Sequence, residues 1–209
     1  MAATKTDLMA DVAAYYTRTL QDHGITPRGV DWNGEDGQRN RFAQLARLLP
    51  ETGFSVNDLG CGYGAFHGFL SETHRDFRYI GYDVSAAMVE AARGALPADG
   101  VAVIQAETPT VTADFTVASG IFNVRMGRDP GEWQDYILTT LDAMDAASTH
   151  GFAFNCLTGY SDADKMRPDL HYADPLALFD HCKRRYARNV ALLHDYGLWE
   201  FTLLVRKTV

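Results

Sequence analysis

The sequence has no long apolar run, few cysteines and no excess of positive charge. Because no stretch of about 18 apolar residues occurs, we expect no membrane-spanning helix and no membrane partner. The 19 lysines and arginines are outnumbered by 27 aspartates and glutamates, which gives a formal charge of −8. This balance disfavours a protein that follows the phosphates of a nucleic acid.

Cysteine usage points to a reducing compartment. Cys61, Cys156 and Cys182 are odd in number and too widely spaced for a disulfide framework or a zinc site. The first residues, MAATKTDLMADVAA, lack the charged segment and apolar core of a signal peptide. We therefore expect a cytoplasmic location.

Segments with the pattern of strands and of helices alternate along the middle of the chain. Short β-rich runs occupy residues 54–59, 77–83, 101–106, 115–119 and 152–157, and helical patterns occupy residues 65–72, 85–95 and 132–148. Such alternation predicts βαβ units and an α/β fold with a parallel sheet. The 209 residues, 46% of them hydrophobic, suffice for one domain of this kind without disulfide or metal support.

The C-terminal part predicts a different strand direction. A helical pattern at residues 175–185 precedes two strand patterns at residues 189–194 and 199–206, joined by the short turn at residues 195–197. A connection this short permits only an antiparallel hairpin. We therefore expect a seven-stranded, mostly parallel Rossmann-like sheet with a C-terminal antiparallel hairpin and helices on both faces.

A glycine-rich loop lies where a strand is expected to lead into a helix. Gly60, Gly62 and Gly64 follow the strand at residues 54–59, so backbone N–H groups and the positive end of a helix dipole would face a ligand. Asp83 lies nineteen residues past Gly64, at the end of the next strand. A carboxylate there can accept hydrogen bonds from both hydroxyls of a ribose, which predicts a nucleoside-containing cofactor.

More than one nucleoside fits this arrangement. Gly60-x-Gly62-x-x-Ala65 satisfies the dinucleotide pattern, which would make the chain a nicotinamide-dependent oxidoreductase. Two observations disfavour a nicotinamide cofactor. Asp58 favours a positively charged ligand over a pyrophosphate, and the residues after Asp83 are needed to complete the same sheet, which leaves little of the chain for a separate substrate domain. A non-catalytic nucleoside-binding module is a further alternative.

Two motifs together carry a family resemblance. Asp58-x-Gly60-x-Gly62-x-Gly64, followed by Gly81-Tyr-Asp83-x-Ser85-x-x-Met88, resembles the class I S-adenosyl-L-methionine-dependent methyltransferases over residues 54–157. The segment from Gly29 to Phe42 is similar to one in small bacterial members, many without an assigned substrate. The resemblance implies S-adenosyl-L-methionine as the cofactor and methyl transfer as the reaction.

The resemblance also implies roles for eleven cofactor-binding residues. Asp58, Gly60, Cys61 and Gly62 would hold the methionine part, Asp83 the ribose, Val84 and Met88 the adenine face, Glu107 the adenine amino group, and Ser119 would lie under the sulfonium; Gln38 or Arg41 would bind the cofactor carboxylate. Gln38 could instead cap a backbone group, and Arg41 could form a surface ion pair.

The first 50 or so residues and two later loops are expected to surround the acceptor. We expect substrate contacts from Tyr15, Trp32, Tyr160, Lys165 and Tyr172, although Trp32 could instead anchor the packing of the lid. The candidate general bases are His171, in the loop before the helical pattern at residues 175–185, and His194, directly before the terminal turn. If the acceptor arrives unprotonated, alignment alone suffices and no base is needed.

Two sequence motifs that are absent narrow the class of methyl acceptor and the expected mechanism. The segment from Ser119 to Asn123 lacks the Asn/Asp-Pro-Pro-aromatic signature of enzymes that methylate planar amino groups, and no acidic pair follows Ser119 to hold a metal. We therefore expect a metal-independent enzyme that acts on an O, N or C nucleophile of a small molecule, as a monomer or homodimer. The expected division is a helical lid at residues 1–50 and a cofactor-binding core at residues 51–209, with a substrate cover at about residues 158–185.

Overall fold

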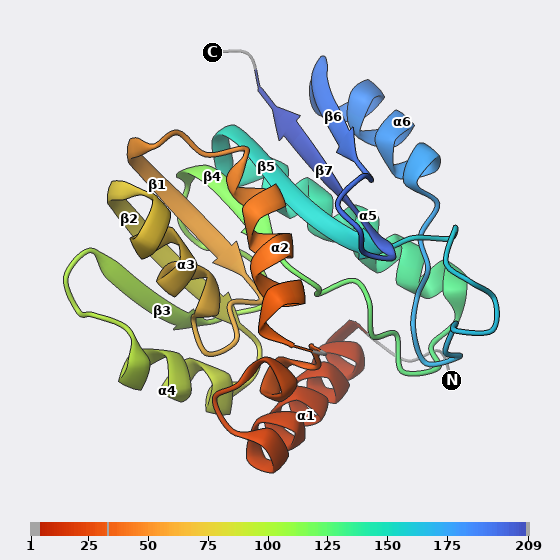
Figure 1. Ribbon diagram of the computed structural model, residues 1–209, viewed down its shortest axis with the longest axis horizontal. Helices are drawn as coiled ribbons and strands as arrows, with labels where there is room; N and C mark the ends of the chain where they lie inside the picture. Colours follow the sequence, from red (N-terminus) through yellow and green to blue (C-terminus); the bar gives the residue numbers. More distant parts are fainter. Residues whose placement is uncertain (1–4, 33, 208–209) are drawn as a thin grey trace.

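A computed structural model describes residues 5–32 and 34–207 of the chain. Its centre is a seven-stranded sheet in the order β3-β2-β1-β4-β5-β7-β6 (Figure 1). The strands are β1 (Thr52–Leu59), β2 (Arg75–Asp83), β3 (Val101–Gln105), β4 (Ala113–Ala118), β5 (Ser148–Leu157), β6 (Asn189–Leu193) and β7 (Glu200–Arg206). Only β7 runs antiparallel to its neighbours β5 and β6. This arrangement confirms the predicted mostly parallel sheet with a C-terminal antiparallel hairpin.

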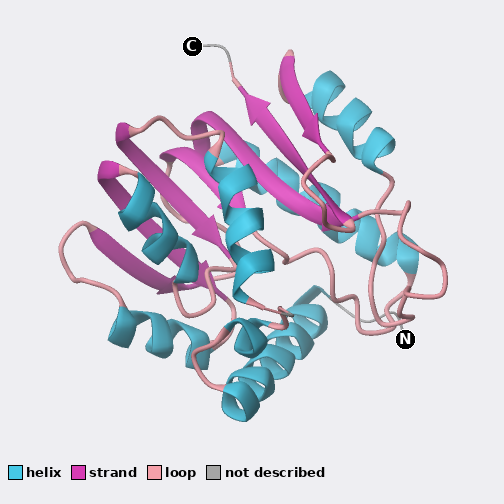
Figure 2. Ribbon diagram, viewed as in Figure 1, coloured by secondary structure: helices cyan, strands magenta, loops and turns pink. Residues whose placement is uncertain are grey.

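Helices cover both faces of the sheet (Figure 2). One face packs against α2 (Glu35–Ala46), α3 (Ala65–Thr73) and α4 (Ala86–Ala95), in a core that contains Phe42, Phe66 and Val89. The other packs against α5 (Pro130–Ala146) and α6 (Pro175–Arg185), around Trp133 and Cys182. None of the helices in the described ranges is long and apolar enough to cross a membrane.

Two helices begin at an Asp-Pro pair. Asp129 and Asp174 each accept hydrogen bonds from two backbone N–H groups of the first turn of α5 and α6. Pro130 and Pro175 follow as the first helical residues, where the missing N–H of proline costs nothing. These Asp-Pro pairs explain why the predicted start of α6 agrees with the structure and that of α5 differs by two residues.

The junction between α5 and β5 differs from the expected one. The sequence pattern predicts a helix through Ser148, whereas that residue begins β5 and pairs with Ala113 of β4. Its hydroxyl donates to the carbonyl of Met144 at 2.6 Å, and its oxygen lies within hydrogen-bond distance of Thr116 Oγ1, at 2.9 Å. These two bonds end the helix and attach the new strand to the sheet within one residue.

The N-terminal segment lies partly across the carboxyl ends of the parallel strands and partly on a face of the sheet. Helix α1 (Lys5–His23) and the 3-10 helix η1 (Pro27–Val30) extend beneath the carboxyl ends of the parallel strands (Figure 1). Helix α2 instead packs against α3, β5 and β7. Within the lid expected at residues 1–50, residues 1–4 and 33 lie outside the described residues, and α1 with η1 is the part that covers the strand ends.

Candidate active site

A single cavity lies at the carboxyl ends of β1, β2 and β4, against α1 and η1. It is lined by all eleven residues predicted to bind the cofactor: Gln38, Arg41, Asp58, Gly60, Cys61, Gly62, Asp83, Val84, Met88, Glu107 and Ser119. Among the predicted substrate residues, Trp32 also lines it. The cavity therefore joins the glycine loop to the N-terminal segment in one space.

The glycine loop is bound tightly to the end of β2. Gly60 and Cys61 both donate to the carbonyl of Tyr82, at 2.8 and 2.9 Å. Gly60 has a φ of 76°, and a Cβ there would lie 2.2 Å from Cγ2 of Ile121. A side chain at this position is thus excluded both by the backbone conformation and by the space.

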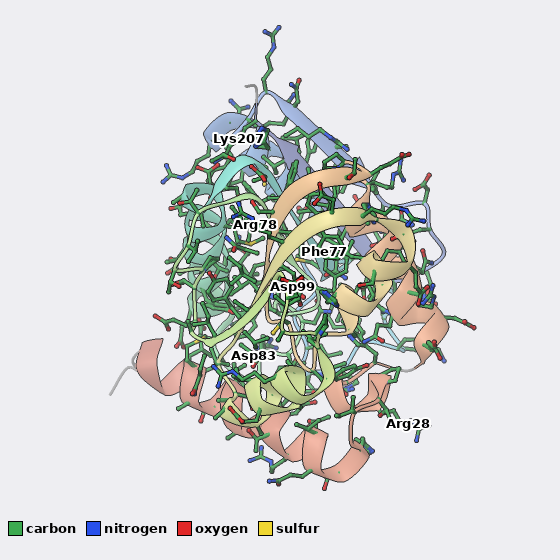
Figure 3. All side chains as sticks on the ribbon, turned by 90° about the vertical axis from the view of Figure 1, so that its left-hand side faces the viewer. Arg28, Phe77, Arg78, Asp83, Asp99 and Lys207 are labelled. Carbon is green, nitrogen blue, oxygen red and sulfur yellow. The ribbon has the colours of Figure 1, made fainter. Side chains whose placement is uncertain are left out.

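Asp83 ends β2 and faces the cavity. Its Oδ2 accepts from the N–H of Gly62 at 3.0 Å and its Oδ1 from the N–H of Ser85 at 2.8 Å. Each oxygen keeps a lone pair for a ligand hydroxyl. Burial raises the pKa of Asp83 to about 6, although the backbone N–H groups of Ser85 and Gly62 lower it. Figure 3 shows Asp83 at the end of β2 that faces α1, whereas Lys207 lies at the opposite end of the molecule.

Asp58 is a deeply buried acid of the cavity wall. It is 2% exposed, and its Oδ2 accepts a hydrogen bond from the hydroxyl of Tyr79 at 2.5 Å. Burial raises the pKa of Asp58 to about 7, against the opposite effect of the Tyr79 bond, and the charge of Asp83 adds to the rise. Ionised Asp58 is therefore costly to the fold without a cation nearby.

Burial also raises the pKa of the Cys61 thiol well above its ordinary value, with the nearby charges of Asp58 and Asp83 as further causes. This disfavours a role of the Cys61 thiol as a nucleophile.

Arg41 forms a buried ion pair in place of the surface pair that the sequence left open. Its Nε and Nη2 donate to the carboxylate of Glu200, with distances of 2.6–2.9 Å. Its guanidinium carbon lies 3.9 Å from the centre of the Trp32 ring. Nη1 makes no hydrogen bond to the described residues, so Arg41 can offer the N–H groups of this nitrogen to a cofactor carboxylate.

Gln38, the other candidate for the cofactor carboxylate, is buried next to Tyr63. Its amide oxygen and nitrogen each lie 3.5 Å from the Tyr63 hydroxyl, at the outer limit of a hydrogen bond. Since both residues line the cavity, a ligand can take over these weak contacts. The binding roles of Gln38 and Arg41 stay predictions.

The remaining acceptor candidates do not line the cavity. Tyr15 donates to Oδ2 of Asp31 at 2.9 Å, and its neighbour Tyr16 faces the cavity instead. The Tyr172 hydroxyl accepts from the backbone N–H of Arg167 at 2.9 Å. Tyr160 is exposed, and Lys165 forms an exposed pair with Asp164.

Neither histidine predicted as a general base contributes to the cavity wall. The His194 ring packs between those of Tyr160 and Phe201. Burial lowers the pKa of His171, as does the charge of Arg125. Its Nε2 is buried and has no hydrogen-bond partner among the described residues. Their catalytic roles stay predictions that this geometry does not favour.

Several lining residues carry chemistry that the sequence did not reveal. Asp31, Asn123, Tyr136, Arg167 and Glu200 contribute polar groups to the wall. One signal was available for Glu200, which is the one acid of strand β7 and precedes a mostly apolar run. Another was Asp31, which lies directly before Trp32 in the segment similar to small bacterial methyltransferases and has a φ of 61°.

Comparison with known proteins agrees with this geometry. A family model described as a methyltransferase domain matches residues 56–126. The chain is 56% identical over 158 residues to Rv1506c of Mycobacterium tuberculosis, a protein that its name places among the methyltransferases. This match covers 74% of the chain and 93% of that protein.

Two solved structures share the fold. The magnesium protoporphyrin IX methyltransferase of Synechocystis PCC 6803, with bound S-adenosylmethionine, matches with a TM-score of 0.70 at 14% identity, over 100% of both chains. The 1,6-didemethyltoxoflavin-N1-methyltransferase of Burkholderia thailandensis gives 0.67 at 17% identity, over 100% of this chain and 92% of the other. The relative and the family model disfavour the oxidoreductase and the non-catalytic module. The chain belongs to the class I S-adenosyl-L-methionine-dependent methyltransferases.

Proposed function

We propose that the chain transfers the methyl group of S-adenosyl-L-methionine to an O, N or C nucleophile of a small molecule, without a metal ion. The observation that carries this proposal is the continuity of one cavity. Its wall joins the glycine loop and Asp83 to Trp32 and Asp31 of the N-terminal segment. A cofactor held on the first set would have its reactive end within the same space as an acceptor held on the second.

The residues of the wall fit this cofactor. S-adenosyl-L-methionine carries a ribose, an adenine, an amino acid end and a positively charged sulfur. Asp83 has lone pairs for the ribose hydroxyls, and the acids Asp58 and Glu107 suit cationic or hydrogen-bond-donating groups. The Ser119 hydroxyl is buried in the wall without a hydrogen-bond partner among the residues that the structure describes, as expected of a group that meets a ligand.

Alignment is the main task of the protein in this reaction. When bound, the cofactor supplies an electrophilic methyl group on a sulfur that leaves readily. The chain has to hold the acceptor in line with the bond that breaks and keep water away, and such positioning can supply about 7–11 kcal/mol of the barrier. Trp32 is suited to this role, because Arg41 stacks on its ring and a Cβ on Gly120 would lie 2.4 Å from its Cζ2 atom.

The cover over the cavity supports a small acceptor. Helix α1 and η1 lie across the strand ends, and Met9, Val12 and Tyr16 of α1 reach the wall. The two structural neighbours named above act, by their names, on magnesium protoporphyrin IX and on 1,6-didemethyltoxoflavin. The net charge of −8 further favours a small molecule over a nucleic acid as acceptor.

The proposal is tested by label transfer. The protein is incubated with methyl-labelled cofactor and a bacterial metabolite extract, with and without EDTA. We expect label in one or a few low-molecular-weight products, in equal amounts under both conditions. Label in the macromolecular fraction would contradict the small acceptor, and loss of transfer with EDTA would contradict metal independence.

The Asp83→Ala variant is expected to bind S-adenosylhomocysteine about 30- to 1,000-fold more weakly than the wild type. It loses two hydrogen bonds to a charged carboxylate, which contribute on the order of 2–4 kcal/mol together. Isothermal titration measures the effect, with Asp99→Ala, an exposed acid between α4 and β3, as the control. Unchanged affinity of Asp83→Ala would refute the ribose role, and heat from NAD with none from S-adenosylhomocysteine would refute the cofactor.

A further inference from the structure

We propose that the side-chain amide of Asn123 binds an oxygen atom of the methyl acceptor, so that the acceptor class comprises small molecules with a carboxylate, carbonyl or hydroxyl next to or at the nucleophile. This inference rests on the proposed methyl transfer. It concerns a residue that the cofactor motifs do not include.

In the side-chain amide of Asn123 the oxygen is hydrogen-bonded to the described part of the chain, whereas the NH2 group is not. Its Oδ1 accepts from the backbone N–H of Leu157 at 3.1 Å. Only the oxygen of an amide can accept a hydrogen bond, so the atom next to the N–H of Leu157 is the oxygen and the remaining terminal atom is the nitrogen of the NH2 group. Asn123 is 5% exposed and lines the cavity, and its Nδ2 donates to no group in the described part of the chain. The wall therefore offers two N–H donors that lack a protein acceptor.

The position of Asn123 is fixed by contacts on both sides. Its N–H donates to the carbonyl of Gly120 at 3.3 Å, and its carbonyl accepts from the N–H of His171 at 2.8 Å. The next residue, Val124, forms a β-bridge with Leu170. The preceding carbonyl, of Phe122, accepts from the indole of buried Trp133 at 2.9 Å. A donor held this rigidly is preorganised and loses little entropy when it binds a ligand.

The turn that carries Asn123 lies where an acceptor is expected. It begins at Ser119, whose unpartnered hydroxyl lines the same cavity. Gly120, in between, is packed so closely against Trp32 that a Cβ would lie 2.4 Å from the Cζ2 atom of the indole. Asn123 thus belongs to the wall shared by Trp32 and the end of β4, rather than to the part formed by Asp83 and Met88.

The NH2 group of Asn123 favours ligands that carry an oxygen lone pair. An amide NH2 group donates hydrogen bonds and accepts none, so it pairs with an oxygen lone pair and not with an ammonium. Oxygen-bearing acceptors are therefore favoured over simple amines.

Asn123→Asp separates this role from a purely structural one. The aspartate keeps an oxygen for the N–H of Leu157 but replaces the two donors by a second oxygen, which repels an oxygen ligand. Thermal unfolding shows whether the variant folds. Asn189→Asp, at the exposed start of β6, is the matched control.

The test follows the Asn123 side-chain amide by NMR in 15N-labelled protein saturated with S-adenosylhomocysteine, with the resonances assigned from their loss in Asn123→Asp. The probes are benzoate, benzamide and phenol, and benzylamine serves as the ammonium counterpart of the same ring. We expect at least one oxygen probe to shift the amide resonances, to bind at least tenfold more weakly to Asn123→Asp, and to bind equally to Asn189→Asp.

Two results would overturn the proposal. One is the absence of any shift with all three oxygen probes, and the other is a larger shift with benzylamine. If Asn123→Asp does not fold, the Asn123 side-chain amide is assigned from its through-space contact with the N–H of Leu157, and the shifts in the wild-type protein decide alone. Failure of S-adenosylhomocysteine to bind would instead contradict the proposed function, and it is measured first.

Discussion

The Asp58→Asn variant is expected to be more stable than the wild type at pH 8 and to bind S-adenosyl-L-methionine on the order of 10- to 100-fold more weakly. Asparagine keeps an oxygen for the Tyr79 hydroxyl, which donates to Asp58 at 2.5 Å. The change therefore removes the charge with little change in shape. Affinity falls because a buried carboxylate next to a cationic ligand is replaced by a neutral amide.

The gain in stability follows from the pKa of the buried acid. Asp58 has a pKa of about 7 in the fold, raised chiefly by burial, against about 3.9 in an unfolded chain. The folded state thus binds the proton more tightly, and stability decreases as the pH rises from about 4 to about 7. Above that range the ionised acid costs the free protein on the order of 4 kcal/mol. Asparagine does not titrate, so its advantage is greatest at pH 8 and shrinks toward pH 4.

Calorimetric unfolding at pH 5 and pH 8 measures the difference, and titration with the cofactor at pH 8 measures the affinity. Asp99→Asn changes an exposed acid and should leave both quantities unchanged. An equal unfolding temperature of wild type and Asp58→Asn at pH 8 would show that Asp58 is not an ionised, destabilising group. Unchanged affinity would show that its charge does not contact the cofactor.

The fold and the cofactor half of the cavity were predictable because their signals are local in the sequence. The glycine loop, Asp58 and Asp83 each stand at the end of a strand, so the topology alone brings them to one edge. The predicted strands agree with the structure within four residues at their starts for the same reason. The exception at Ser148 arises from side-chain bonds to Met144 and Thr116, which no periodicity reveals.

The acceptor half could not be predicted to the same depth, because it depends on contacts between distant segments. Tyr15 and Tyr16 are adjacent and chemically alike, and the contact of Tyr15 with Asp31 decides which of them faces the cavity. Asn123 is one of several asparagines in the sequence. Only the bond from Leu157, 34 positions away, shows which half of its amide is free.

The largest loss of stability is expected for Glu200→Ala. Glu200 is 1% exposed, accepts three hydrogen bonds from Arg41 and also accepts from Nδ2 of Asn155 at 2.8 Å. Its removal leaves a largely buried guanidinium and a buried amide without an acceptor. Breaking such a pair costs about 3–5 kcal/mol, which lowers the unfolding temperature of a chain of this size by about 10 °C.

Glu200→Ala should also disturb the cavity wall. The two partners of Glu200 contact that wall, because Asn155 Oδ1 accepts from the N–H of Gly120 at 2.8 Å and Arg41 stacks on Trp32. We therefore expect reduced S-adenosylhomocysteine affinity in the same variant. Glu72→Ala is the matched control, since its pair with Arg39 has side chains 58% and 43% exposed and contributes at most about 1 kcal/mol.

The double variant Arg41→Met with Glu200→Leu tests whether the unpaired charge of Arg41 accounts for the stability lost in Glu200→Ala. Because the two charges are removed together and similar volumes are restored, it should recover much of the stability lost in Glu200→Ala. It should not recover full cofactor affinity, since Asn155 still lacks its acceptor and Trp32 its cation. An unfolding temperature as low as that of Glu200→Ala would show that the unpaired Arg41 does not account for the loss, and would assign it to the missing acceptor of Asn155.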